Sequence, residues 1–270
     1  MSTLQEEADI APARHLRVAA VGDVHFDGGT TGALREIFAE INAQADILAL
    51  LGDLTTHGHP QQIEGFIAEL KGIEIPIVTV LGNHDYEGGQ HEVVTAMLEE
   101  RDIHVLDGSG VEIEGVGFAG TKGFAGGFGR GALAPFGEPL IKEFVKQAVD
   151  EAMKLENALR TLTTETKIAL LHYSPVEDTV RGEPETIWPF LGSSRLVQPL
   201  DAIGATVVFH GHAHHGSLEG STPGGIPVYN VSLPLLRQED MHFRIYEVPA
   251  PDRRKPRGRQ TIQPNAATTR

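Results

Sequence analysis

The sequence contains no cysteine among its 270 residues. Disulfide bonds and thiolate metal sites are therefore excluded, and any metal ion must be held by His, Asp, Glu or Asn side chains. The sequence also lacks an uninterrupted run of about 20 apolar residues, the length that a membrane-spanning helix needs. Its first 13 residues are acidic rather than apolar, so we expect no signal peptide and interpret the chain as cytoplasmic.

Positive charge is scarce, because 22 Lys and Arg residues stand against 37 Asp and Glu residues and give a formal net charge of −15. An acidic surface repels the phosphate backbone of nucleic acids, so nucleic acid is a disfavoured partner. The length fits one large domain. We place this domain at residues 14–249, between an N-terminal arm (1–13) and a flexible basic tail (250–270).

Short apolar runs alternate with segments of helical periodicity in the first half of the chain. The runs Leu16–Val21, Asp46–Leu51 and Ile75–Leu81 are typical of strands that are buried on both faces. Helices are expected between and after them, at Thr31–Asn42, Gln61–Leu70 and Glu92–Glu100. This alternation predicts an α/β fold with a largely parallel sheet, in which ligands bind beyond the carboxyl ends of the strands.

The second half has a different pattern. Val111–Gly120 alternates like an antiparallel strand, and Gly120–Gly137 is a Gly-rich segment with three phenylalanines that we interpret as a long loop over the site. A long amphipathic helix is expected at Pro139–Leu162. Further strands are expected at Lys167–Leu171, Thr206–Phe209, Pro227–Val231 and His242–Val248.

Polar residues stand at the ends of five apolar runs. In chain order they are Asp23-Val24-His25, Gly52-Asp53, Gly82-Asn83-His84-Asp85, His172, and Gly211-His212-Ala213-His214. This ordered set resembles the calcineurin-like metallophosphoesterase superfamily, whose pattern is DxH, GD, GNH(D/E), H and GHxH. The resemblance extends from about Val18 to Leu233, and every motif position matches. Among its members, the chain looks similar to bacterial cyclic-nucleotide phosphodiesterases and their relatives.

The residue types suit phosphoester hydrolysis. The reaction needs a hydroxide nucleophile and neutralisation of the developing negative charge, and two metal ions about 3.5–4 Å apart can supply both. A carboxylate can bridge two ions, and histidines supply neutral nitrogen ligands. Side chains two positions apart in extended structure share a face. Asp23 with His25, and His212 with His214, can therefore act together.

The resemblance implies a four-layer α/β/β/α sandwich with two mixed β-sheets and a metal site at the carboxyl ends of the strands. It implies two metal ions, and the histidine and carboxylate donors admit manganese, iron or zinc. The implied ligands are Asp23, His25 and His214 for one ion, Asn83, His172 and His212 for the other, and Asp53 as the bridge. Gly22, Gly52, Gly82 and Gly211 each stand one residue before a ligand and would permit close backbone approach.

His84 has no metal in this scheme. The resemblance gives it contact with the phosphoryl group or protonation of the leaving group, a task that suits imidazole. Asp85 would orient His84 through a hydrogen bond. The implied reaction is attack of a metal-bound hydroxide on a small or medium-sized phosphate ester, with diesters favoured over monoesters. Two alternatives are a nuclease of the same fold and a non-catalytic metal-binding scaffold.

The other histidines and cations have simpler interpretations. We interpret His210 as structural, and His215 as either a pocket residue or a loop cap. The histidines that we expect at the surface are His15, His57, His59, His91, His104 and His242, with a role on the substrate side as the alternative for His57 and His59. Solvated surface charge is favoured for Lys122, Arg130 and Arg181, although each could bind phosphate and the Gly-rich loop favours Arg130 among them.

Overall fold

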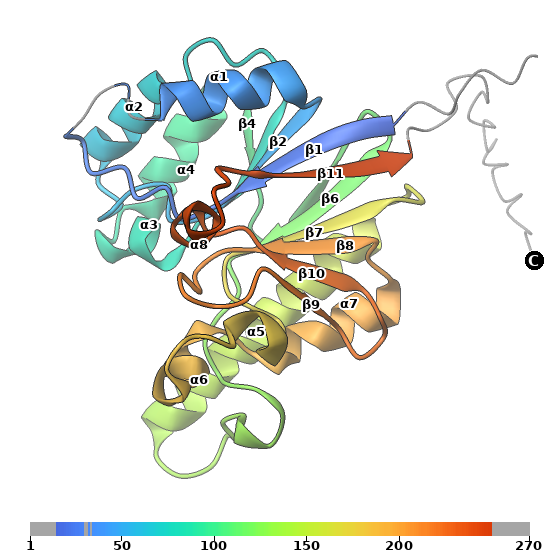
Figure 1. The fold of residues 1–270 in the computed structure, drawn as a ribbon. Coiled ribbons are helices and arrows are strands. Elements are labelled where there is room, and N and C mark those ends of the chain that lie inside the picture. Colours follow the sequence, from blue (N-terminus) through green and yellow to red (C-terminus); the bar gives the residue numbers. More distant parts are fainter. Residues whose placement is uncertain (1–14, 30–31, 33, 250–270) are drawn as a thin grey trace, which may run out of the picture.

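The computed structural model describes residues 15–29, 32 and 34–249. They form an α/β fold with two facing β-sheets and helices on both outer sides (Figure 1). The N-terminal arm and the basic tail of the sequence analysis lie outside the described residues. Within the described residues, every helix is too short or too polar to cross a membrane.

The first sheet has five strands, which lie in the order β11-β1-β2-β3-β4. They are β1 (His15–Val21), β2 (Ile47–Leu51), β3 (Ile77–Val80), β4 (Ile103–Val105) and β11 (Arg244–Pro249). β1 to β4 are parallel, and β11 pairs antiparallel with β1. The last described strand of the chain therefore lies beside the first.

The second sheet has six strands, in the order β5-β6-β7-β8-β10-β9. They are β5 (Ser109–Ile113), β6 (Val116–Thr121), β7 (Lys167–Leu171), β8 (Val207–His210), β9 (Glu219–Ser221) and β10 (Pro227–Asn230). The four inner strands are parallel, and β5 and β9 are antiparallel edge strands. Both sheets are mixed, as predicted.

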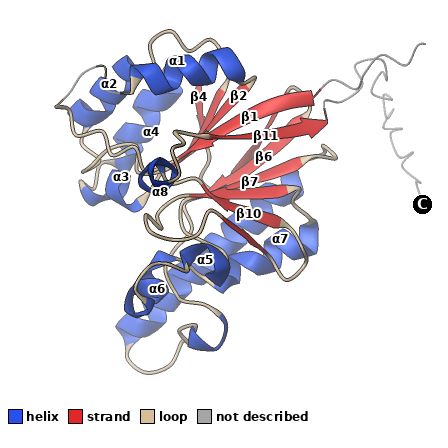
Figure 2. Cartoon of the chain, in the orientation of Figure 1, coloured by secondary structure: helices blue, strands red, loops and turns tan. Residues whose placement is uncertain are grey.

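Helices complete the outer layers of the sandwich (Figure 2). Beside the first sheet lie α1 (Arg35–Gln44), α2 (Pro60–Glu69), α3 (Asn83–Glu87) and α4 (His91–Glu99). On the side of the second sheet are α5 (Pro139–Thr161), α6 (Trp188–Leu191) and α7 (Val197–Ile203), and the short α8 (Leu233–Gln238) precedes β11. Short 3-10 turns lie at Gly129–Gly131, Glu177–Val180, Glu185–Ile187 and Ser194–Leu196. The order of layers is helix, sheet, sheet, helix, so the predicted four-layer sandwich is confirmed.

Strand β7 shows why the apolar runs are nearly continuous. Ile168 and Leu170 pack in the core that is shared with the first sheet, whereas Ala169 and Leu171 pack in a second core with α5 and α7. All four side chains are fully buried. Successive side chains of a strand point to opposite faces, so a strand between another sheet and a helix layer must be apolar at every position.

The segment predicted as one antiparallel strand, Val111–Gly120, is a hairpin instead. β5 ends at Ile113 and β6 begins at Val116, and the two residues between them have positive φ angles, 51° for Glu114 and 83° for Gly115. Two consecutive positive φ angles are typical of a two-residue hairpin turn. The sequence prediction missed this turn because glutamate is uncommon at its first position.

Candidate metal centre

The residues of the five motifs meet at the carboxyl ends of strands from both sheets. They are Asp23 and His25 after β1, Asp53 after β2, Asn83 after β3, His172 after β7, and His212 and His214 after β8. Parallel strands place their carboxyl ends at one edge of a sheet, and the two sheets face each other at that edge. The first sheet supplies four of the seven candidate ligands and the second sheet supplies three, so the site bridges the two sheets.

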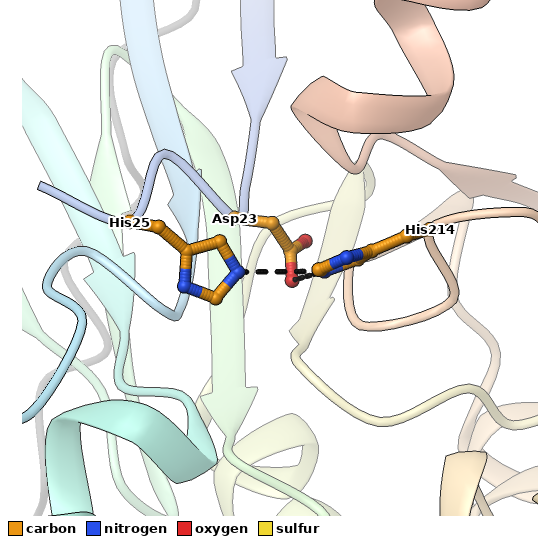
Figure 3. A group of neighbouring side chains, drawn as sticks. All are labelled: Asp23, His25 and His214. Atoms are coloured by element: carbon orange, nitrogen blue, oxygen red, sulfur yellow. Dashed lines mark hydrogen bonds and ion pairs between the residues drawn. The ribbon is translucent and has the colours of Figure 1, made fainter.

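Asp23, His25 and His214 form one group (Figure 3). Nε2 of His214 lies 3.1 Å from Oδ1 of Asp23 and 3.4 Å from Nε2 of His25. Two neutral imidazoles that present lone pairs to each other at this distance would repel, so a proton or a cation must lie between them. The ligand atoms of the three residues lie within 4.8 Å of one another, and a single metal ion can join all three.

Asp53, His172 and His212 form a second group of the same kind. Nε2 of His172 lies 3.4 Å from Oδ1 of Asp53 and 2.9 Å from Oδ1 of Asn83. On its other side, Nδ1 of His172 donates a hydrogen bond to the carbonyl oxygen of Leu51 at 2.8 Å. That bond fixes the ring and leaves Nε2 as the nitrogen available to a metal ion.

Asp53 belongs to the second group and also lies beside the first. Its Oδ2 is 3.8 Å from Nε2 of His25 and 3.9 Å from Nε2 of His84, while its Oδ1 faces His172. Nδ1 of His84 donates to the carbonyl oxygen of Thr56 at 2.7 Å, so Nε2 is the nitrogen that faces the centre. Asp53 therefore lies beside candidate ligands of both groups.

The charges in the centre stabilise the ionised carboxylates. Burial favours the neutral form of Asp53, but the positive charge of His172 outweighs it and holds the pKa of Asp53 below its usual range. Burial likewise opposes protonation of His172, yet the Asp53 carboxylate raises the pKa of His172 to about 9. The hydrogen bond with His214 lowers the pKa of Asp23 in spite of burial. Anionic carboxylates beside imidazoles, with oxygen and nitrogen as the only donor atoms, fit manganese, iron or zinc ions.

Four of the seven candidate ligands have unusual backbone conformations. The φ angle is 56° for Asp23, 44° for His25, 48° for Asp53 and 71° for His212. This left-handed region costs an L-residue about 1–2 kcal/mol. Such conformations gather at functional sites, where the surrounding structure holds them. The motif spacing does not predict this strain, because the strain depends on the path of the chain between the two sheets.

The glycines before the ligands permit the close approach that was predicted. A Cβ atom on Gly52, whose φ is +79°, would lie 2.7 Å from Nδ1 of His172 and 2.6 Å from the backbone nitrogen of Gly82. A Cβ atom on Gly82 would overlap the carboxylate of Asp53. Both separations are too short for real carbon atoms, so neither glycine can be replaced without displacing a ligand.

The structure corrects the role that was predicted for Asp85, because its carboxylate does not contact the His84 ring. It accepts hydrogen bonds from the backbone N–H groups of Leu54, Thr55 and Gly82 and from the Thr55 hydroxyl, at 2.9–3.2 Å. These donors occupy both carboxylate oxygens, because the chain turns around the buried Asp85 side chain. Asp85 therefore holds the segment that ends in Thr56, and it positions His84 only through the carbonyl of that residue.

Two residues expected at the surface are half-buried against Tyr86. Lys122 lies among the rings of Tyr86, Phe124 and Tyr173, with Nζ 5.1–5.2 Å from each ring centroid. His91 stacks on Tyr86, with ring centroids 4.1 Å apart. The predictions were wrong because they treated single charged or polar residues as solvated and did not consider aromatic neighbours that come from distant segments.

Only the first part of the Gly-rich segment adjoins the centre. The carbonyl oxygen of Lys122 accepts hydrogen bonds from the backbone N–H groups of the two residues after β7, and Phe128 is buried against α6. Phe136, by contrast, is 85% exposed. Arg130 is exposed, and within the described part of the chain it makes no contact with the metal-centre residues.

The other minor predictions are mostly confirmed. His210 is fully buried and pairs with the Thr179 hydroxyl at 2.7 Å, which is a structural role. The exposed residues include His15, His57, His59, His104, His215 and His242. The guanidinium of Arg181 is solvated and pairs with Asp178 at 3.3 Å.

Sequence reasoning missed Tyr173. Its buried ring lies 4.5 Å from the His212 ring, centroid to centroid, and 5.6 Å from the ring of His172. It directly follows His172 at the carboxyl end of β7. The ligands were located by inspecting the residues at the end of each apolar run, and the same rule would also have found this tyrosine.

Comparison with known proteins agrees with this geometry. The sequence profile of calcineurin-like phosphoesterases matches residues 16–216. An uncharacterized metallophosphoesterase of Campylobacter jejuni is 24% identical over 192 residues, which are 68% of this chain and 48% of that protein. The chain thus spans about half the length of this relative.

Two solved structures share the fold at low sequence identity. Phosphopantetheinyl hydrolase from Mycobacterium tuberculosis has a TM-score of 0.60 at 14% identity, over 89% of this chain and 98% of that one. A Thermus thermophilus protein has a TM-score of 0.53 at 17% identity, over 88% and 100% of the two chains. The profile match over residues 16–216 shows that the chain belongs to the calcineurin-like phosphoesterase family.

Proposed function

We propose that the chain is a dinuclear metal-dependent phosphoesterase that prefers phosphodiesters to phosphomonoesters. The observation that carries this proposal is the position of Asp53 between two groups of candidate ligands, one with Asp23 and one with His172. A single ion would need only one of the groups. Asp53 belongs to the second group, and its Oδ2 also lies 3.8 Å from Nε2 of His25 in the first. A buried carboxylate that lies beside both groups suits two adjacent ions.

The residues of the chain have distinct tasks in this proposal. When bound, the two ions would activate water as the nucleophile and offset the charge that develops on the phosphoryl group. Asp53 holds the two ligand groups in a fixed relation. His84 is held through Nδ1 by the carbonyl of Thr56, so its Nε2 can donate a proton to the departing oxygen of the ester.

The first test is hydrolysis of bis(p-nitrophenyl) phosphate by protein loaded separately with manganese, iron and zinc. We expect release of p-nitrophenol with at least one metal and none after chelation. The preference for diesters predicts a higher kcat/KM for this substrate than for p-nitrophenyl phosphate. Absence of turnover of both substrates with every metal would reject the proposed activity, and a higher kcat/KM for the monoester would reject only the preference.

A further inference from the structure

A lysine follows β6 in the way that the candidate ligands follow their strands. Lys122 is the first residue after β6, and its carbonyl oxygen accepts the backbone N–H groups of His172 and Tyr173, each at 3.0 Å. Its backbone is therefore joined directly to a candidate metal ligand. The position of Lys122 relative to the metal centre is fixed by these two bonds.

A buried carboxylate on α5 holds the residues on both sides of this lysine. Glu151 is 1% exposed, and its Oε2 accepts the Thr121 hydroxyl at 2.5 Å and the backbone N–H of Gly123 at 3.0 Å. Its Oε1 accepts Lys154 at 3.0 Å. Glu151 is thus saturated by other donors, and it acts on Lys122 by anchoring the backbone rather than by pairing with the ammonium group.

The ammonium group of Lys122 has few partners of its own. It donates to the carbonyl oxygen of Gly123 at 3.1 Å and otherwise faces three aromatic rings. Among the described residues, no carboxylate oxygen lies within the 4.0 Å of an ion pair with its Nζ, whereas the neighbouring Lys154 is paired with both Asp107 and Glu151. An ammonium group has three donors, so Lys122 retains donors for a ligand.

Lys122 also lines a pocket. The pocket has a volume of about 420 Å³ and its lining includes Lys122, Tyr86 and His91 as well as the carboxylates of Glu92, Glu99 and Asp107. Asp107 is paired with Lys154. It lies at the carboxyl ends of β3, β4 and β6, the same side of the sheets as the metal centre. Its volume is within the range of pockets that bind small molecules, about 300–1,000 Å³.

The pocket and the metal centre are also neighbours on α3. Asn83 and Tyr86 are three residues apart on that helix, so they share a face. Asn83 contacts His172 in the centre, and Tyr86 lines the pocket and faces Lys122. The pocket that Lys122 lines therefore adjoins the metal centre through α3.

We propose that Lys122 is a substrate-binding residue whose ammonium group donates hydrogen bonds to anionic phosphate oxygens of the substrate. The inference rests on the proposed phosphoesterase function and adds a residue that recognises the substrate at the same site. The oxygens belong either to the reacting phosphoryl group or to a second phosphate in the pocket. Both sources present anionic oxygens to an ammonium group. Titration with inorganic phosphate and with methylenediphosphonate distinguishes them.

The test is calorimetric titration of inorganic phosphate and of methylenediphosphonate into manganese-loaded protein. We compare Lys122→Met, which keeps the apolar stem among the rings, with Lys122→Arg, which keeps the charge. The matched control is Lys167→Met, because Lys167 lies at the start of β7, the opposite end of that strand from His172. Thermal unfolding of each variant checks that the fold is retained.

We expect Lys122→Met to weaken anion binding about 10- to 100-fold, the usual effect of losing hydrogen bonds to a charged group. Lys122→Arg should retain most of the affinity, and Lys167→Met should bind as the wild type does. Weaker binding of both anions would assign Lys122 to the reacting phosphoryl group. Weaker binding of methylenediphosphonate alone would assign Lys122 to a second phosphate.

Equal binding of both anions by the wild type and Lys122→Met would overturn the inference. If Lys122→Met fails to fold, Lys122→Gln takes its place, and equal binding by that variant overturns the inference in the same way. Binding is measured without turnover, so the two proposals can fail separately. Normal diester hydrolysis with unchanged anion binding in Lys122→Met would refute this inference alone. Absence of hydrolysis in the wild type, together with Lys122-dependent binding, would refute only the proposed function.

Discussion

His84 faces the metal centre through Nε2 while its Nδ1 is held by the carbonyl oxygen of Thr56. Replacing His84 with alanine should lower turnover about 10²- to 10⁴-fold, the usual contribution of acid–base catalysis. Metal content should remain near the wild-type value, because all seven candidate ligands are still present. Steady-state kinetics and elemental analysis of one preparation measure both quantities.

His104→Ala is the control for that variant, since His104 is exposed on β4 and should affect neither quantity. Loss of an ion together with turnover would contradict the acid role of His84. It would make His84 a ligand instead, which its place within 4.8 Å of His25 and Asp53 permits.

Asp53 allows metal binding and backbone strain to be measured separately. Both Asp53→Ala and Asp53→Gly should deplete the two ions, because the shared carboxylate is lost. In the metal-free state, the glycine variant should be more stable than the alanine variant by about 1 kcal/mol, since φ is 48° and glycine adopts this region without a steric penalty. Urea unfolding of the two apo-proteins gives the difference, and an alanine variant of equal or greater stability would show that the backbone relaxes there.

For single residues, the sequence predicted which side chains come together at the metal centre but not which partners each of them contacts. The ligands were recognisable because Asp23, Asp53 and His172 each follow an apolar run. The partners of Asp85 and Lys122 were not predictable from the sequence. They depend on turns and rings that come from segments far away in the chain.

Helix α5 and strand β6 are joined by one buried charge. Glu151→Ala would leave the Thr121 hydroxyl, the Gly123 N–H and the Lys154 ammonium without their acceptor. We expect a loss of about 3–5 kcal/mol in the free energy of unfolding, as is typical when one partner of a buried ionic network is removed. Chemical denaturation measures it. The control is Asp150→Ala, a half-buried neighbour whose ion pair with Lys146 lies at the surface.

The elements themselves were largely predictable where burial fixes the pattern. β7 lies between another sheet and a helix layer, so every residue from Ile168 to Leu171 is apolar and its bounds were predicted correctly. The β5–β6 hairpin and the short α7 and α8 were missed. A turn at Glu114 and helices of six or seven residues have too few periodic positions to be recognised from sequence.

Across the whole molecule, the metal centre links the two sheets. His25 belongs to the first sheet and His214 to the second, and their Nε2 atoms are 3.4 Å apart. Ions bound between the sheets should stabilise the fold by about 4 kcal/mol when the free metal concentration is 1,000 times the dissociation constant. Chelation should therefore lower the melting temperature by several degrees, and calorimetry before and after restoration of metal measures the change.

The Asp53→Ala variant is the control for that experiment, because chelation should leave its melting temperature unchanged. An equal decrease in the variant and the wild type would show that the chelator acts elsewhere.

The division into two sheets was implied by the family resemblance and not by the apolar pattern. Alternating strands and helices are equally compatible with one large sheet.

The pairing of β11 with β1 brings the two described ends of the chain together. Pro249 lies opposite His15 in this pair, at the end of β1 away from Asp23 (Figure 1). The chain is therefore well suited to circular permutation: a short linker could join these ends, and new termini could be opened in an exposed loop. For the same reason, a surface anchor attached directly at His15 or Pro249 would hold the protein by the end of β1 away from the metal centre.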